Sequence, residues 1–275
     1  MGALLYSTEN RGVSYTTILY NIEDGVATIT FNRPDKYNAF NDEQILETTR
    51  AFKDAGRDSA VRAIVLTGAG KAFCAGQDLG DVQERNVTFL EHLRDNYNPL
   101  ILQMRKIEKP IIGALNGAAA GAGLSVALAC DLRIISMKAT LVFASFSRVG
   151  LIPDNGITYY LPRLVGPAKA FELLILADAQ NRIGAEQAVA MGLCTKAVEP
   201  DVFMDEVQAT ARQLAALPTK ALGLTKRMLN ASWDSTLEEM LDMEAQLQEA
   251  ASRTEDYQEG LQAFLEKRPP QFKGR

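Results

Sequence analysis

The amino-acid sequence predicts an α/β fold with a helical C-terminal region. Through its first two-thirds, short apolar runs that end near glycine alternate with segments of helical periodicity, which is the pattern of strands joined by helices. In its last quarter, residues 205–217, 219–232 and 236–251 show helical periodicity with dense i,i+4 charges and no strand pattern. We therefore expect two parts, a core over residues 1–203 and a helical C-terminal region over residues 204–275.

The first expected elements are a hairpin and a helix. The segment VSYTTILYNIEDGVATITFNRP alternates β-favouring residues on both sides of EDG, which is a hairpin turn sequence. In the segment NDEQILETTRAFKDAGRDSAV, Asn41 or Asp42 is a suitable N-cap, and apolar Ile45, Leu46 and Phe52 recur at helical spacing. These two segments predict two paired strands followed by an amphipathic helix.

Strand and helix patterns then alternate. RAIVLTGAG, IIGAL and LRIISM are short apolar runs typical of buried strands, AGLSVALAC is typical of a helix, and GAEQAVAMGLCTKAVEP predicts a short helix, a turn and a strand. This order predicts right-handed crossovers between parallel strands. The uncharged stretch 111–130 is long enough to span a bilayer, but its many Ala and Gly residues favour a buried strand, loop and helix.

Composition limits the partners of the chain. Of its 275 residues, 47% are hydrophobic and 23% are charged, which is the ordinary range of soluble globular proteins. The net charge is −5 and no long block of Lys and Arg occurs, so we expect neither a nucleic acid nor a membrane as partner. The N-terminal segment lacks the sustained apolar stretch of a secretion signal, so we expect a cytoplasmic protein that binds small molecules or copies of itself.

The few cysteines and the single histidine argue against several kinds of site. Cys74, Cys130 and Cys194 are odd in number and far apart, so neither a disulfide framework nor a CxxC metal site is expected. One histidine, His92, provides neither a zinc site nor a Ser-His-Asp triad. It lies in a predicted helix, where we expect it at the exposed surface.

Two glycine-rich loops are candidate hydrogen-bond donors. AGKAFCAGQDL (69–79) and NGAAAGAGLS (116–125) each follow a predicted strand, and their backbone N–H groups can approach a ligand oxygen, as an oxyanion hole requires. Neither loop has the GxGxxG spacing or the P-loop lysine of nucleotide sites. From glycine content alone, tight packing is the stronger alternative.

Four motifs carry a resemblance to a known family. NRPDKYNAFN, GAGKAFCAGQDL, KPIIGALNGAAAGAGLSVALACDLRI and GLIPDNGITYYLPRLVG occur in the order and spacing of the crotonase superfamily, the enoyl-CoA hydratases and isomerases. The resemblance runs from about residue 17 to the end of the chain. It implies a crotonase-like spiral of β-β-α units with a C-terminal helical region that builds trimers, which often pair into hexamers. It also implies an acyl-CoA thioester as substrate, so coenzyme A is part of the substrate and neither a separate cofactor nor a metal is expected.

The resemblance also implies which residues meet the substrate. The backbone N–H groups of Gln77 and Ala122 are expected to donate to the thioester oxygen. The residues expected to bind coenzyme A are Tyr37, Ala39, Ala75, Gly76, Gln77, Asp78, Leu79 and Gly121. In relatives a C-terminal stretch touches the coenzyme A of a neighbouring subunit, and Phe264 and Lys267 correspond to it here, with a solvated basic chain end as the alternative.

The pattern of carboxylates decides which reaction is expected. The two glutamates that hydratases use correspond to Ser125 and Phe146, neither of which titrates near neutral pH, so hydration is disfavoured. Asp154 corresponds to an acidic residue of the isomerase relatives, and GLIPD most resembles the enoyl-CoA isomerase and epoxyphenylacetyl-CoA isomerase branch. We expect apolar Leu151, Ile152 and the acyl pocket to raise the pKa of Asp154, which then acts as acid and base.

Several alternatives stay open. DNG is strong turn chemistry, so Asp154 is alternatively an Asx-turn residue. The protein is alternatively a hydratase, an acyl-CoA dehalogenase or thioesterase-like enzyme, or a non-catalytic acyl-CoA-binding scaffold. Phe89, Leu93 and Tyr97 fall at i, i+4 and i+8 of a predicted helix, where they either face the acyl chain or pack on the core. The acyl group, and with it a role in fatty-acid or aromatic-acid degradation, is left open by the sequence.

Overall fold

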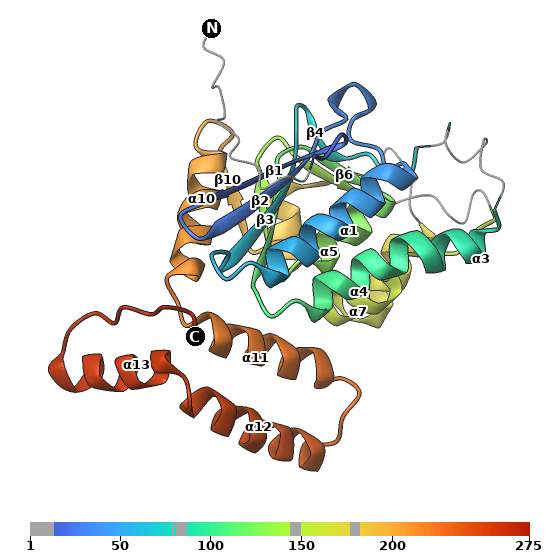
Figure 1. Cartoon of the computed structure of the whole chain (residues 1–275). Helices are drawn as coiled ribbons and strands as arrows, with labels where there is room; N and C mark the ends of the chain where they lie inside the picture. The colour runs from blue at the N-terminus through green and yellow to red at the C-terminus, as the bar shows by residue number, and fades with distance from the viewer. Residues whose placement is uncertain (1–13, 79, 81–86, 144–149, 177–181) are drawn as a thin grey trace, which may run out of the picture.

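Two β-sheets form the centre of the molecule (Figure 1). The structure is a computed structural model that describes residues 14–78, 80, 87–143, 150–176 and 182–275. The larger sheet has the order β1-β2-β3-β5-β7-β10 and consists of β1 Ile18–Glu23, β2 Val26–Phe31, β3 Ala63–Gly68, β5 Ile111–Leu115, β7 Leu132–Ser136 and β10 Lys196–Val198. The smaller sheet has the order β4-β6-β8-β9 and consists of β4 Ala72–Cys74, β6 Ala118–Ala120, β8 Thr140–Val142 and β9 Ile183–Gly184.

The chain repeats one unit as it winds through both sheets. Along the sequence, β3 and β4, then β5 and β6, then β7 and β8 place one strand in the larger sheet and the next in the smaller, and helices follow each pair. From β2 to β10 the neighbours in the larger sheet are parallel, which requires crossover connections. The β-β-α spiral expected from the family resemblance is therefore confirmed.

Helices cover this centre. They are α1 Asp42–Arg57, α3 Phe89–His92, α4 Asn98–Lys106, α5 Ala122–Ala129, α7 Ile157–Val165, α8 Pro167–Ile175, α9 Ala185–Ala190 and α10 Phe203–Ala215. A short 3₁₀ helix, η1 Pro34–Lys36, follows β2, and a π-helical turn, η2 Leu93–Tyr97, joins α3 to α4. None of the helices in the described ranges is both long enough and apolar enough to cross a bilayer.

The predicted hairpin and first helix are both present. Asp24 and Gly25 have φ values of 49° and 76° between β1 and β2, the left-handed pair that a type I′ hairpin turn needs. Asn41 caps α1, because its side-chain oxygen accepts a hydrogen bond from the Gln44 N–H at 3.0 Å. Local sequence was sufficient for both, since each depends on residues close together in the chain.

The larger sheet is buried on both faces. Along β3, Ala63 and Val65 pack in one apolar cluster with α10, while Ile64 and Leu66 pack in another with α1, α4 and α5. Burial on both faces explains why this strand is a continuous apolar run without alternation. The uncharged stretch 111–130 forms β5, β6 and α5 within the same core, as expected.

Three helices extend away from the sheets (Figure 1, orange to red). They are α11 Thr219–Ala231, α12 Leu237–Ser252 and α13 Glu255–Glu266, and we call them the helical tail. Helix α10, at the start of the predicted C-terminal region, packs on the larger sheet. The division into 1–203 and 204–275 stays a prediction, and α13 lies beyond the helices that the sequence pattern predicted.

Candidate active site

Two segments far apart in the sequence are joined side by side at the candidate site. Phe40 and Gln77 form a parallel bridge in which the Phe40 N–H donates to the Gly76 carbonyl at 2.7 Å, and the Asp78 N–H donates to the Phe40 carbonyl at 2.9 Å. One step earlier, the Ala75 N–H donates to the Tyr37 carbonyl at 3.0 Å. The bridge thus gathers most of the predicted coenzyme A contacts, namely Tyr37, Ala39, Ala75, Gly76, Gln77 and Asp78. Leu79 lies outside the described residues.

Asn38 holds the first of these segments in its bent path. It is fully buried at a φ of 57°, and its side-chain amide donates to the carbonyls of Ala69 at 2.9 Å and Ala72 at 2.8 Å. Its side-chain oxygen accepts from the Arg33 N–H at 3.0 Å. Asparagine tolerates the left-handed conformation that this path requires. Sequence reasoning missed Asn38, although the motif that contains it was recognised.

An ion pair holds the two segments together from the side. The Arg33 guanidinium donates to the Asp78 carboxylate at 2.9 Å, and this hydrogen bond lowers the pKa of Asp78 below its usual range. A second hydrogen bond joins Arg33 to the carbonyl of Ala39. Asp78 is therefore an ionised anchor for this loop and has no role as an acid near neutral pH.

The two glycine loops meet at Gly76. Its φ of 102° is one that side chains rarely adopt, and an added Cβ would lie 3.1 Å from the Ala120 oxygen and 3.6 Å from the Ala122 nitrogen. The Phe40 bridge uses the Gly76 carbonyl and the Asp78 amide, so the amide of Gln77 points to the other side of the ladder. Glycine at position 76 therefore allows this loop to approach the backbone of Ala120 and Ala122 closely. It also allows the backbone conformation that directs the Gln77 amide.

Ala122 provides the second predicted donor at the start of a helix. It is the first residue of α5, follows the N-cap Gly121 at a φ of 48°, and is buried. The first N–H groups of a helix have no acceptor in the helix itself, and the helix dipole makes this end attractive to negative charge. Ala122 lies close to the Gln77 loop, since a Cβ on Gly76 would be 3.6 Å from the Ala122 nitrogen, and its role as a donor to the thioester oxygen stays a prediction.

Asp154 lies beside the first turn of the same helix. The Ser125 hydroxyl is 3.4 Å from the Asp154 carbonyl oxygen, and Ser125 is fully buried. Asn155 and Gly156 follow Asp154 with φ values of 55° and 79°, and the Ile157 N–H closes the turn on the Asp154 carbonyl at 3.2 Å. DNG therefore forms a turn, as its sequence predicts, and a backbone hydrogen bond closes that turn.

Burial raises the pKa of Asp154 to about 6, while a hydrogen bond from its own backbone N–H partly opposes this shift. The expected direction is confirmed, but the expected cause is wrong in part. Leu151 and Ile152 are 46% and 81% exposed, so they do not bury the carboxyl group. The tertiary contact printed for this residue is on its backbone, where the Ser125 hydroxyl lies 3.4 Å from the Asp154 carbonyl oxygen. Phe146 lies outside the described residues.

Asn155 is a buried polar residue next to the candidate base. Its side-chain oxygen is buried and has no hydrogen-bond partner among the described residues. Sequence reasoning treated Asn155 as turn chemistry only, and its φ of 55° explains that part of its selection. The turn sequence contained no indication that this amide would be buried.

The helix before β5 differs from its expected form. Phe89 is 58% exposed whereas Tyr97 is 2% exposed, so Phe89, Leu93 and Tyr97 do not share one face. The reason is the π-helical turn Leu93–Tyr97, whose wider winding breaks the regular i, i+4, i+8 spacing. His92 is 4% exposed, contrary to the expected surface position, and its ring packs edge-on against Tyr97 at 5.2 Å between centroids.

Phe264 and Lys267 are not brought to the other site residues. They lie at the end of α13 in the helical tail, at a distance from β4 and β6 (Figure 1). Phe264 is strongly exposed, and Lys267 ends the helix in a left-handed conformation. Their expected contact with the coenzyme A of a neighbouring subunit stays a prediction.

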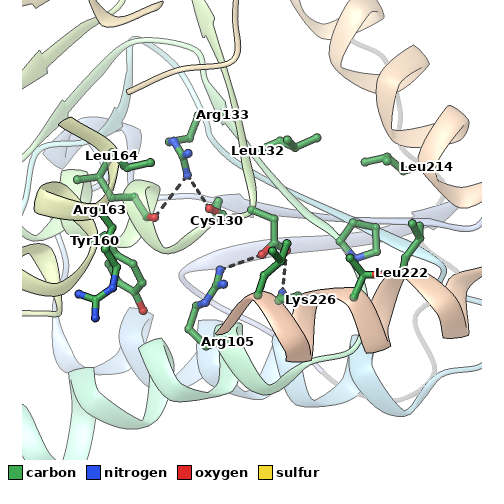
Figure 2. A pocket seen from close by; sticks show the side chains of 15 residues that line it. Arg105, Cys130, Leu132, Arg133, Tyr160, Arg163, Leu164, Leu214, Leu222 and Lys226 are labelled. Atoms are coloured by element: carbon green, nitrogen blue, oxygen red, sulfur yellow. Dashed lines mark hydrogen bonds and ion pairs between the residues drawn. The ribbon is translucent and has the colours of Figure 1, made fainter. Parts of the chain in front are cut away.

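A cavity of about 360 Å³ lies at the opposite end of α5 (Figure 2). Arg133 lines it and donates to the Leu193 carbonyl at 2.6 Å and to the Cys130 carbonyl at 2.6 Å. Arg105 and Lys226 both bind Asp131, each at 2.8 Å. These cations are engaged with helix ends and with Asp131, and no predicted site residue lines the cavity. It is therefore separate from the candidate active site.

Comparisons with known proteins identify the family of this chain. The family model described as enoyl-CoA hydratase/isomerase matches residues 21–275. A 1,2-epoxyphenylacetyl-CoA isomerase of Escherichia coli K12 is 44% identical over 94% of this chain and 98% of its own length. A probable enoyl-CoA hydratase of Rhodobacter capsulatus is 44% identical over 96% of this chain and 100% of its own length. A crystal structure of a putative enoyl-CoA hydratase from Streptomyces coelicolor A3(2) is 35% identical, with a TM-score of 0.88 over the full length of both chains. The chain therefore belongs to the enoyl-CoA hydratase/isomerase family of the crotonase superfamily, and it is an acyl-CoA enzyme of that family.

Proposed function

We propose that this protein is an enoyl-CoA isomerase in which Asp154 moves a proton from one carbon of the acyl chain to another. The observation that carries the proposal is the Asp154 carboxyl group, whose pKa burial raises to about 6, in a residue whose backbone carbonyl lies 3.4 Å from the Ser125 hydroxyl in the first turn of α5. A carboxyl group with a pKa near the working pH takes up and returns a proton with similar ease. That property suits a reaction in which one group is first base and then acid.

The proposed reaction needs only a base and a stabilised enolate. Asp154 removes a proton from the carbon between the double bond and the thioester, and the electron pair moves onto the thioester oxygen. The N–H groups of Gln77 and Ala122 stabilise that oxygen. The enolate then collapses as carbon at the far end of the former double bond takes the proton back from Asp154, so no atom is gained or lost. Loss of one such donor costs roughly 10²–10³ in rate in other enzymes.

Hydration is disfavoured because the second carboxyl group is missing. Ser125 occupies the position of the first hydratase glutamate, and its hydroxyl contacts the carbonyls of Gly121 at 3.3 Å and Asp154 at 3.4 Å. A hydroxyl group cannot donate or accept a proton as a glutamate does near neutral pH. The second position carries Phe146, which has no titratable group at all.

We propose a second, related point about assembly. The helical tail exposes large apolar side chains, among them Leu237, Phe264 and Leu265. Exposed apolar groups of this size on one set of helices support association with further copies of the chain. A trimer or hexamer would also let Phe264 and Lys267 reach coenzyme A bound to a neighbouring subunit. Sedimentation of the purified protein tests the assembly, and a monomer at micromolar concentration would contradict it.

The experiment compares the protein with Asp154→Asn on two thioesters. A linear 3-enoyl-CoA and a ring-derived epoxyphenylacetyl-CoA cover the substrate classes suggested by the motif and by the Escherichia coli relative. Products are followed by the absorbance of the conjugated 2-enoyl thioester and by mass. We expect isomer of unchanged mass from the parent protein, and a loss of roughly 10³ in kcat for the variant, while calorimetry still detects thioester binding.

A matched control and the other outcomes complete this test. Asp201→Asn changes an exposed turn aspartate and should leave kcat unaltered. A product heavier by one water indicates a hydratase, and free coenzyme A indicates a thioesterase-like enzyme. Halide release from a halogenated aryl-CoA indicates a dehalogenase. Thioester binding without any product indicates a scaffold.

A further inference from the structure

The side chain of Gln77 is held at both ends of its amide. Its nitrogen donates to the Phe40 carbonyl at 2.9 Å, and its oxygen accepts from the Tyr97 hydroxyl at 2.7 Å. The same Phe40 carbonyl also accepts from the Asp78 N–H at 2.9 Å. One carbonyl therefore fixes both the side chain of Gln77 and the peptide that follows it.

The peptide before Gln77 is held at its carbonyl, that of Gly76, which accepts a hydrogen bond from the Phe40 N–H at 2.7 Å. Gly76 sits at a φ of 102°, and glycine is the residue with the greatest backbone freedom. The direction of the Gln77 N–H is set by this Gly76–Gln77 peptide. Because the backbone can turn at glycine, the direction of the amide depends both on this hydrogen bond and on the contacts that hold the Gln77 side chain.

Tyr97 is itself a rigid support. Its ring packs edge-on against Phe40 at 5.9 Å and against His92 at 5.2 Å between centroids, and it is almost fully buried. Tyr97 is the last residue of the π-helical turn, which separates its direction from that of exposed Phe89. π-Helical turns inside longer helices are frequent at functional sites, where the wider winding re-aims a side chain.

We propose that Tyr97 is a positioning residue for the oxyanion hole. Its hydroxyl holds the Gln77 side chain, and through that side chain it keeps the Gln77 N–H directed at the thioester oxygen. Tyr97 acts through Gln77 and does not itself touch the substrate. This inference rests on the proposed use of the Gln77 amide as a donor, and it adds the residue that keeps the donor in place.

Tyr97→Phe is the test variant, because it keeps both ring contacts and removes only the hydroxyl. Two readouts are needed: steady-state kinetics, and the infrared carbonyl band of a saturated acyl-CoA labelled with ¹³C at the thioester carbon. The band reports hydrogen bonding to the thioester oxygen without any turnover. We expect kcat to fall about tenfold, a part of what losing a whole donor costs, with KM little changed. We also expect the bound carbonyl band to move back toward its frequency in solution.

Two further variants separate positioning from general packing. Tyr15→Phe removes the tyrosine hydrogen bond to Asp54, 2.9 Å long and remote from the site, and should leave kcat and the carbonyl band unaltered. Gln77→Met removes the side-chain amide at nearly constant volume. In that background, Tyr97→Phe should have no additional effect on kcat, because the coupled partner is already gone.

The outcomes separate this inference from the proposed function. An unaltered carbonyl band in Tyr97→Phe, or kinetic effects of Tyr97→Phe and Gln77→Met that simply add, overturns the inference even if the isomerase reaction is confirmed. A carbonyl band that responds to Tyr97→Phe supports the inference even if the product is not an isomer. A thioester that binds the parent protein with no shift of its carbonyl band overturns the use of the Gln77 donor, and the inference with it.

Discussion

The hydroxyl oxygen of Ser125 lies 3.4 Å from the backbone carbonyl oxygen of Asp154. Ser125 belongs to the first turn of α5, whose N-terminal residue Ala122 is the candidate donor to the thioester oxygen. The candidate base and one candidate oxyanion donor are therefore attached to the same helix end. A helix turn is a stiffer support than a loop.

Replacements of Ser125 should distinguish support from catalysis. Ser125→Ala loses two long hydrogen bonds, so we expect less than about 1 kcal/mol of stability to be lost and kcat to change little. Ser125→Glu puts a larger, charged group into a fully buried position, which should cost about 1–3 kcal/mol. The added carboxylate should also raise the pKa of Asp154 further. Urea unfolding and product analysis check both variants, and hydrated product from Ser125→Glu would contradict us.

The rate should depend on pH through Asp154. Burial raises its pKa to about 6, and the base must be ionised before it removes a proton. We expect kcat/KM to be level well above pH 6 and to fall about tenfold per pH unit well below it. A pH profile with a linear 3-enoyl-CoA measures this. A profile that stays level down to pH 4.5, with the protein still folded, would exclude Asp154 as the base.

The same pKa shift predicts how stability depends on pH. In the unfolded chain the Asp154 pKa is about 3.9, below its folded value, so between these values the folded protein holds more protons. Its contribution to the free energy of unfolding is then present below pH 4 and is lost as the pH rises through 6. Asp154→Asn removes this loss, so its Tm relative to the parent protein should be higher at pH 7 than at pH 4. Equal differences at both pH values would speak against a buried carboxyl group.

Gly123 should be needed for the close approach of α5 to β4. A Cβ on Gly123 would lie 2.5 Å from the Cys74 carbonyl oxygen, which is backbone and cannot move aside cheaply. Gly123→Ala should therefore push α5 away from β4, lower the free energy of unfolding by about 1–3 kcal/mol and reduce kcat sharply. Gly184→Ala is the matched control, because a Cβ there meets no atom within 4 Å. Thermal unfolding and kinetics of the two variants should diverge, and equal behaviour would contradict the close approach.

Lys226 should anchor the helical tail to the core. From α11 its amino group donates to Asp131 at 2.8 Å and to the Met104 carbonyl at 2.9 Å, and it is buried (Figure 2). Lys226→Met leaves those acceptors without this partner, so we expect the free energy of unfolding to fall by about 3 kcal/mol. In this variant the rate of amide hydrogen exchange should increase more in α11 than in α5. Lys169→Met, which breaks an exposed pair with Glu172, should cost less than about 1 kcal/mol.

Local patterns accounted for most of the elements but not for their irregularities. The hairpin turn at Asp24 and Gly25 and the Asn41 cap depend on a few consecutive residues, so the sequence predicted both. The π-helical turn ending at Tyr97 was not predictable in this way, because a 3.6-residue period was assumed throughout. The buried position of His92 follows from the same turn and from contacts with distant residues. Regular winding is a local property, whereas a widened turn is held by tertiary packing.

The candidate site also has features that the sequence predicted and features that it did not. Motif order alone identified the family, and it supplied the two candidate donor loops and the residue exchange at Ser125, because these depend on residue identity at fixed spacing. The surroundings of Asp154 were a different matter. Leu151 and Ile152 adjoin it in sequence yet are exposed, while Ser125, from a helix 29 residues earlier, contacts it.

The sequence by itself thus determined which chemical groups stand at the key positions of this protein: an acid at position 154, no acid at position 125, and glycine at positions 76 and 123, where backbones approach closely. The tertiary structure alone decided their directions and their surroundings. It joined Phe40 to Gln77, set Tyr97 on the Gln77 side chain and placed Asp154 beside α5. The physical reason is that a pKa and a hydrogen-bond direction depend on which atoms are near in space, and those atoms need not belong to neighbours in the chain.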